Sequence, residues 1–106
     1  MIVATIHEIP NHDVVEILGI VEGNTIRARS VLRDILAVLK NIIGGEIEEY
    51  TKLMAESRDQ AVDRMIEQAE ELGADAILDM RFSTSEIMSG AAEILAYGTA
   101  VKLKMK

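Results

Sequence analysis

Two histidines and two acidic residues, His7, Glu8, His12 and Asp13, lie close together near the start of the chain. Imidazole nitrogens and carboxylate oxygens are the usual ligands of divalent cations in a protein without thiolates. However, the two histidines are five positions apart, one too many for the HExxH zinc motif, and Pro10 breaks the helix that this motif needs. A solvated loop is therefore the interpretation that we favour, with a divalent-metal site as the alternative.

Other polar clusters do not predict a reaction. Glu67, Glu70 and Glu71 have the spacing of one helix face, which is typical of the solvated side of an amphipathic helix. The hydroxyl-rich segment 83–89 lacks a G-x-S-x-G elbow, and no histidine follows it to act as a base. We therefore expect no catalytic residues and no cofactor, and we lean towards a protein that is not an enzyme.

Charge and composition exclude several classes of partner. The chain has 106 residues, with 11 basic and 18 acidic side chains, a net charge of −7 and no cysteine. Nucleic acids and anionic membranes would repel such a chain, and thiolate metal sites and disulfides are excluded. The sequence contains neither a signal-peptide pattern nor an apolar run of about 18 residues. We expect one cytoplasmic domain spanning residues 1–106.

The supply of apolar residues exceeds the needs of one small core. Counting Gly but not Tyr, about 54% of the residues are apolar, against a usual 45–50%. A small domain with such a surplus most often hides it against another subunit. The composition therefore predicts a homo-oligomer.

The pattern of apolar residues predicts an α+β fold in the order ββααββ. The expected elements are strands at 2–6, 13–21, 76–82 and 92–106, with helices at 31–43 and 46–72. The nearly continuous apolar run 13–21 indicates a strand buried on both faces, and Gly23-Asn24 indicates a turn that closes it. Residues 83–90 read as a polar loop or an irregular strand end.

The two expected helices differ in character. The segment 31–43 is apolar over most of its circumference, so it should be covered on two sides, and Gly44-Gly45 should end it. The longer helix 46–72 has one apolar stripe and should end at Gly73. In the last strand, the odd positions 95–105 should share one face, while Lys102, Lys104 and Lys106 share the other.

Several short motifs together resemble the YbjQ-like family of small prokaryotic proteins. The motifs are V-E-x-x-G-I-V-x-G (15–23), R-D-I (33–35), I-G-G (43–45), Y-x-x-L (50–53), S-R (57–58), G-A-D-A (73–76) and Y-G-T-A-V (97–101). The match covers about 15–101, so His7 and His12 lie before it. The family carries a heavy-metal-binding label and has no assigned mechanism. The label transfers poorly, because soft metals favour thiolates and this chain has none.

The resemblance implies a dodecin-like subunit with an antiparallel sheet and a ring-shaped homo-oligomer, a pentamer. Its signature positions here are Gly44, Gly45, Tyr50, Arg58, Gly73, Tyr97 and Gly98. Among them, Gly98 reads as a point of close approach within a strand. Arg58 reads as a residue that pairs across a subunit interface. The expected function is self-assembly, with an unidentified ligand, and metal binding is the alternative.

Overall fold

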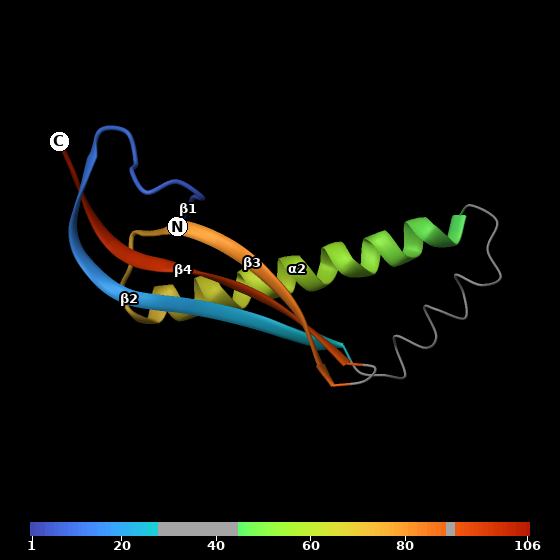
Figure 1. The fold of residues 1–106 in the computed structure, drawn as a ribbon. Coiled ribbons are helices and arrows are strands. Elements are labelled where there is room, and N and C mark those ends of the chain that lie inside the picture. The colour runs from blue at the N-terminus through green and yellow to red at the C-terminus, as the bar shows by residue number, and fades with distance from the viewer. Residues whose placement is uncertain (28–44, 89–90) are drawn as a thin grey trace.

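The computed structural model describes residues 1–27, 45–88 and 91–106, which form a mixed four-stranded sheet with one long helix along one face (Figure 1). The strand order is β1-β3-β4-β2. The elements are β1 (Ile2–Val3), β2 (His12–Arg27), α2 (Gly45–Glu71), β3 (Ala76–Met88) and β4 (Ala91–Met105). The predicted α+β class is confirmed. The helix expected at 31–43, together with Gly44, lies outside the described residues.

The prediction of a wholly antiparallel sheet was wrong. The long strands β2 and β3 both pair antiparallel with β4, but β1 pairs parallel with β3. Only Ile2 and Val3 form this strand, fewer than the expected 2–6. The chain then leaves the β3 edge, crosses the sheet and begins β2 on the opposite edge, so β1 and β2 do not form a hairpin.

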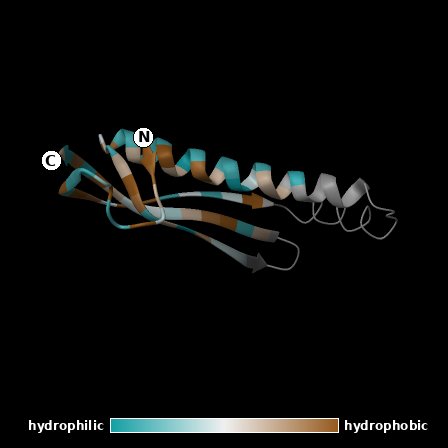
Figure 2. Cartoon of the chain, turned by 90° about the horizontal axis from the view of Figure 1, so that it is seen from above, coloured by the Kyte–Doolittle hydropathy of each residue, from teal (hydrophilic) through white to brown (hydrophobic). Residues whose placement is uncertain are grey.

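Helix α2 packs on the sheet through small and flexible side chains. Ser57, Ala61, Met65 and Ala69 recur every four residues and are fully buried, while bands of hydrophilic residues alternate with them along the helix (Figure 2). The small residues among them let the helix approach the sheet closely. The prediction of a long amphipathic helix over 46–72 is confirmed.

The end of α2 is set by Gly73, whose φ is +76°. The Ala74 N–H donates to the Ala69 carbonyl at 3.1 Å, and the Gly73 N–H donates to the Glu70 carbonyl at 3.0 Å. These two bonds form a Schellman motif, which satisfies carbonyls that the helix itself leaves unpaired. A Cβ on Gly73 would lie 3.7 Å from Lys102 Nζ, so β4 brings a cation to the negative end of the helix dipole.

Strand β2 differs from its prediction in two ways. It runs on to Arg27, so Gly23-Asn24 is not a turn. Gly23 lies beneath α2, where an added Cβ would overlap the Ala61 carbonyl oxygen and the Met65 nitrogen. The strand is also not buried on both faces, because Ile17 is 71% exposed and Ile20 is 77% exposed.

A bulge in β3 overturns the simple alternation expected there. The register with β4 shifts between Leu78 and Arg81, and Asp79 has a φ of +52°. Ile77 and Met80 therefore both face α2, while Leu78 faces the opposite side. The strand also continues to Met88 with a register shift between Glu86 and Met88. Of the two alternatives expected for 83–90, the polar loop was therefore wrong over 83–88, and the irregular strand end agrees with the structure there.

The face of the sheet opposite α2, here called the outer face, is partly covered by the N-terminal segment. Ala4 and Ile9 pack there against Ala76, Leu78 and Val101. The Ala4 N–H donates to the Ile77 carbonyl at 2.9 Å and holds this segment to β3. The cover thus extends over β3 and β4, and the apolar residues of β2 lie beyond it.

Candidate functional site

An exposed apolar row on β2 is the most unusual surface feature of the described residues. The row consists of Val14, Ile17 and Ile20, which are 42%, 71% and 77% exposed. Ile17 is the register partner of Val101, and Ile20 is the partner of Thr99, which places the row on the outer face. Large apolar side chains clustered at such exposure mark contact surfaces in soluble proteins.

Beyond this row, the outer face carries a line of polar residues across three strands. Tyr97 of β4 is the register partner of both Arg81 on β3 and Glu22 on β2. Tyr97 is 37% exposed, so its ring offers an apolar surface between a cation and an anion. Asn24 follows on β2, and its Nδ2 donates to Glu93 Oε2 at 2.9 Å.

The open edge of β2 is closed to strand pairing at its centre by side chains of α2. The Glu22 N–H donates to Gln68 Oε1 at 2.7 Å, and Arg64 Nη1 donates to the Asn24 carbonyl. An unpaired edge would otherwise recruit another strand. The first half of β2 is irregular instead, with register shifts between Val14 and Glu16 and between Ile17 and Gly19. Another copy would therefore contact this edge through the exposed side chains and not through backbone pairing.

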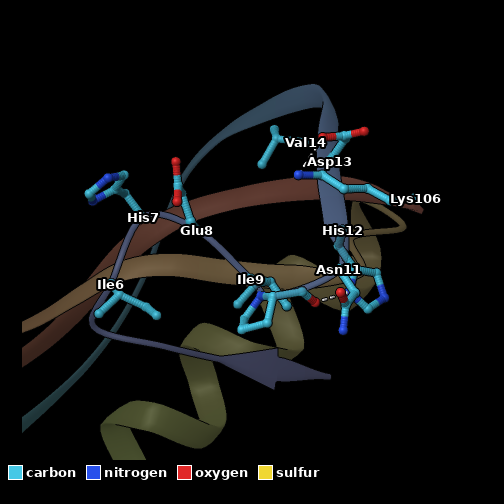
Figure 3. A pocket seen from close by; sticks show the side chains of 10 residues that line it. Ile6, His7, Glu8, Ile9, Asn11, His12, Asp13, Val14 and Lys106 are labelled. Atoms are coloured by element: carbon cyan, nitrogen blue, oxygen red, sulfur yellow. Dashed lines mark hydrogen bonds and ion pairs between the residues drawn. The ribbon is translucent and has the colours of Figure 1, made fainter.

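The N-terminal segment encloses a cavity of about 530 Å³, lined by residues 6–14 and Lys106. Figure 3 shows His7 and Glu8 at one end of this cavity and His12 at the other, with the His7 ring directed away from His12. The structure thus places both predicted histidines on one cavity but does not bring their rings together.

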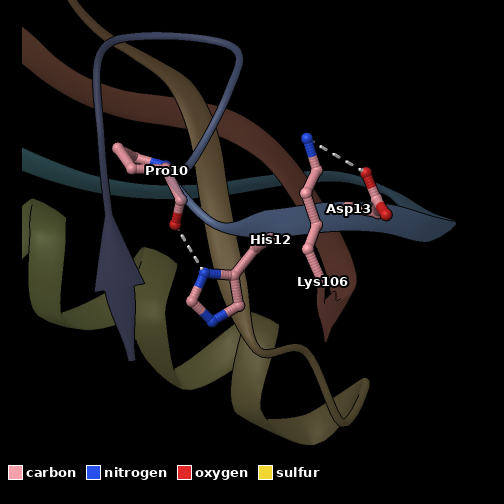
Figure 4. Close-up of polar contacts among 4 residues, drawn as sticks. All are labelled: Pro10, His12, Asp13 and Lys106. Carbon is pink, nitrogen blue, oxygen red and sulfur yellow. Dashed lines mark hydrogen bonds and ion pairs between the residues drawn. The ribbon is translucent and has the colours of Figure 1, made fainter.

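The polar contacts of the cavity are local. His12 Nδ1 lies 2.8 Å from the Pro10 carbonyl oxygen (Figure 4). Since a carbonyl only accepts, the ring donates from Nδ1 in this contact, and Nε2 is the nitrogen that remains for other partners. Lys106 Nζ lies 3.7 Å from Asp13 Oδ1, and both side chains are about 60% exposed, so this ion pair contributes little stability.

The described residues do not gather into a metal-binding cluster. Among residues 1–27, 45–88 and 91–106, no three His, Cys, Asp or Glu side chains gather closely enough to hold an ion. Glu67, Glu70 and Glu71 are exposed on α2, as expected for its solvated side.

The other signature positions lie on different elements. Gly45 is the first residue of α2 and Tyr50 lies in its first two turns, while Arg58 is exposed on the same helix. Gly98 is buried in β4, where an added Cβ would lie 2.6 Å from Ile77 Cγ2 and 3.0 Å from the Leu78 carbonyl oxygen. The structure does not gather these residues into one site.

The comparisons with known proteins assign the family. A family model described as "Putative heavy-metal-binding" matches residues 1–104. This chain belongs to the YbjQ-like family. The match begins at residue 1, so His7 and His12 lie inside it, which corrects the expected start near residue 15.

The relatives are similar over their whole length. A UPF0145 protein of Archaeoglobus fulgidus is 57% identical over 104 residues, 98% of this chain and 96% of that protein. A UPF0145 protein of Thermotoga maritima is 53% identical over 98% of each chain. A crystal structure of a DUF74-family protein of unknown function from Pediococcus pentosaceus has a TM-score of 0.64 at 16% identity, covering 98% of each chain. This last similarity concerns the fold alone.

In the part of the chain that the structure describes, no helix has the length and hydropathy needed to cross a membrane.

The apolar row was missed by the sequence reasoning, although its signal was present. The run D-V-V-E-I-L-G-I-V (13–21) was read as a strand buried on both faces within one chain. A nearly continuous apolar run is equally consistent with one face buried by the chain's own helix and the other by a neighbouring subunit.

Proposed function

We propose that this protein is a self-assembling, non-enzymatic domain whose copies associate through the exposed apolar row of β2. The ring form, the pentameric stoichiometry and the dodecin-like subunit come from the family resemblance and are part of this proposal. So is the cytoplasmic location, which fits a chain without cysteine. The ring would present its cavities to an unidentified ligand.

The single observation that carries the proposal is the exposure of Ile17 and Ile20. Fully burying an exposed isoleucine contributes about 1.5–3 kcal/mol. At 71% and 77% exposure, each of these side chains retains most of that free energy for an intermolecular contact. A monomer gains no stability from exposing both isoleucines to water on the same face of the strand.

The total surface supports the same interpretation. The accessible surface of the chain is 7029 Å², whereas a folded monomer of this mass exposes about 5,900 Å². The radius of gyration is 17.2 Å, against about 13 Å for a compact chain of this length. The chain is thus more extended than a compact monomer of its mass.

The test is the stoichiometry of the wild type and of two aspartate variants, by native mass spectrometry and sedimentation velocity. We expect one defined multimer for the wild type. Ile20→Asp should weaken association at least about 30-fold, since the loss of about 2 kcal/mol of burial has that effect. Leu72→Asp is the matched control, because Leu72 is 46% exposed, follows the last residue of α2 and lies outside the row.

Circular dichroism of both variants establishes whether each remains folded. A folded wild-type monomer at micromolar concentration, or an Ile20→Asp variant that assembles like the wild type, would refute the proposal.

Divalent-metal binding is the alternative function, and one observation favours it. His12 Nδ1 contacts the Pro10 carbonyl, an arrangement that many metal-binding histidines share because it leaves Nε2 for the metal. Elemental analysis of the purified protein and thermal shifts with Zn²⁺, Ni²⁺ and Cu²⁺ test it. We expect any metal-dependent shift in Tm to disappear in the His12→Ala variant. The His7→Ala variant is measured for comparison. Absence of both metal and shift would remove this alternative.

A further inference from the structure

The N-terminal segment divides the outer face of the sheet into a covered part and a bare part. Ile17 of β2 and Val101 of β4 are register partners and lie side by side on this face. Ile17 is 71% exposed, whereas Val101 is 2% exposed. The difference arises because residues 4–9, here called the strap, cover β3 and β4 and leave the row of β2 bare (Figure 1).

The surface beneath the strap is apolar across two strands. Ala76 and Leu78 of β3 are 0% and 4% exposed, and Leu103 of β4 packs against the same cluster. Leu103 is in turn the register partner of Val14, which belongs to the apolar row. Without the strap, the outer face would therefore be apolar continuously from β3 to β2. Apolar sheet faces of this width pack against a second sheet.

Backbone hydrogen bonds attach the strap to β3. The Ala4 N–H donates to the Ile77 carbonyl at 2.9 Å, and the Met80 N–H donates to the Ala4 carbonyl at 3.0 Å. The Asp79 N–H donates to the Ile6 carbonyl at 3.1 Å. Consecutive N–H groups of a regular strand point to opposite edges, so the bulge at Asp79 is what directs two of them to the strap.

Arg81 adds a side-chain clamp to these backbone bonds. Its Nη1 atom donates to the Thr5 carbonyl at 2.9 Å and to the Met80 carbonyl at 2.8 Å. One guanidinium nitrogen thus joins the strap to β3. Hydrogen bonds from a charged donor are stronger than those between neutral groups.

The apolar anchors of the strap are small by comparison. Ala4 and Ile9 pack against the covered cluster, whereas Ile6 is 54% exposed. Residues 6–9 also line the cavity of about 530 Å³, so this part of the strap stands over open space. The strap is therefore held in place chiefly by its bonds to β3 and by the Arg81 clamp.

We propose that the strap limits assembly: by covering β3 and β4, it confines contact between copies to the apolar row of β2. This inference rests on the proposed function and names its regulation. The covered face keeps the multimer closed and defined, because copies cannot stack sheet against sheet across the whole outer face. Release of the strap leads to larger assemblies, and Arg81 is the positioning residue that opposes this release.

Hydrogen exchange of strap variants tests the attachment. Arg81→Ala removes the clamp, and Ala4→Pro removes one backbone donor of the strap. In both variants, the Asp79 and Met80 amides should exchange at least about fivefold faster than in the wild type, because one hydrogen bond of the attachment is lost. Lys104→Ala is the matched control, since it also removes an exposed cation from the sheet but on the opposite face, and it should leave exchange unchanged.

Sedimentation velocity of the double variant Ala4→Pro/Arg81→Ala tests the consequence for assembly. At micromolar concentration, this variant should form species larger than the wild-type multimer, while Lys104→Ala should keep the wild-type stoichiometry. Circular dichroism shows which variants are folded, and the two single variants replace the double variant if it does not fold.

The outcomes separate this inference from the proposed function. A folded variant whose strap amides exchange faster, but which keeps the wild-type stoichiometry or dissociates, overturns the role of the strap and leaves self-assembly standing. Unchanged exchange in both single variants also overturns it, since the strap would then be held by other contacts. A wild type that is itself monomeric overturns both claims.

Discussion

The substitution Gly23→Ala tests the closest approach between α2 and the sheet. An added Cβ would overlap the Ala61 carbonyl oxygen and the Met65 nitrogen, and it would lie 2.7 Å from Arg64 Cβ. Two of these three atoms belong to the helix backbone, so no rotamer change relieves the overlap. The helix must retreat from β2.

The magnitude follows from the size of that retreat. Ordinary contact begins at 3.4 Å, so the Arg64 contact requires about 0.7 Å, and the two closer backbone contacts require more. A gap of 0.5–1 Å forfeits a quarter to a half of the dispersion attraction between the atoms it separates. Met65 and Ala69, both fully buried, lie on the face that would lose contact. We expect a loss of about 3 kcal/mol in the free energy of unfolding, the upper end of the usual range for overpacking.

Thermal and urea unfolding at one fixed protein concentration measure the effect. A loss of about 3 kcal/mol should lower Tm by about 12–24 °C in a domain of this size. Gly19→Ala is an informative comparison, because its Cβ would meet nothing within 4 Å and only its φ of +127° is unfavourable. A Gly23→Ala variant with a Tm within about 2 °C of the wild type would refute the close packing of α2 on β2.

Two further predictions concern the helix end and the open edge. Gly73→Ala should lower the free energy of unfolding by about 1–2 kcal/mol, because a φ of +76° is unfavourable for a residue with a Cβ. Urea unfolding measures this loss, with Glu70→Ala as the control because it keeps the backbone hydrogen bond. An unchanged urea midpoint would contradict the prediction. Gln68→Ala removes the acceptor of the Glu22 N–H at the β2 edge, so we expect faster aggregation by thioflavin fluorescence than for Glu67→Ala. Equal rates for these two variants would show that Gln68 does not protect the edge.

The surface features relate the fold to the proposed assembly. The N-terminal segment covers the outer face over β3 and β4 but not over β2, and this partial cover is what leaves Ile17 and Ile20 exposed. The same short β1 leaves the edge of β3 open beyond Met80. A longer β1 would pair with more of β3 and close that edge.

The sequence by itself predicted the elements whose causes are local. The apolar face of α2 and its end at Gly73 could be predicted, because helical periodicity and the left-handed cap depend only on neighbouring residues. The last strand was readable from its alternation, and the apolar surplus was readable from composition.

Only the tertiary structure decided the features that depend on pairing between distant segments. Gly23 looks like a turn residue in sequence, but α2, about 40 residues away, requires it as a site of close approach. The bulge at Asp79 moves Met80 to the helix side, which no local pattern indicates. The exposed row also depends on where the N-terminal segment crosses the sheet. Register, bulges and coverage are set by long-range contacts, because the same local sequence is compatible with either face of a strand.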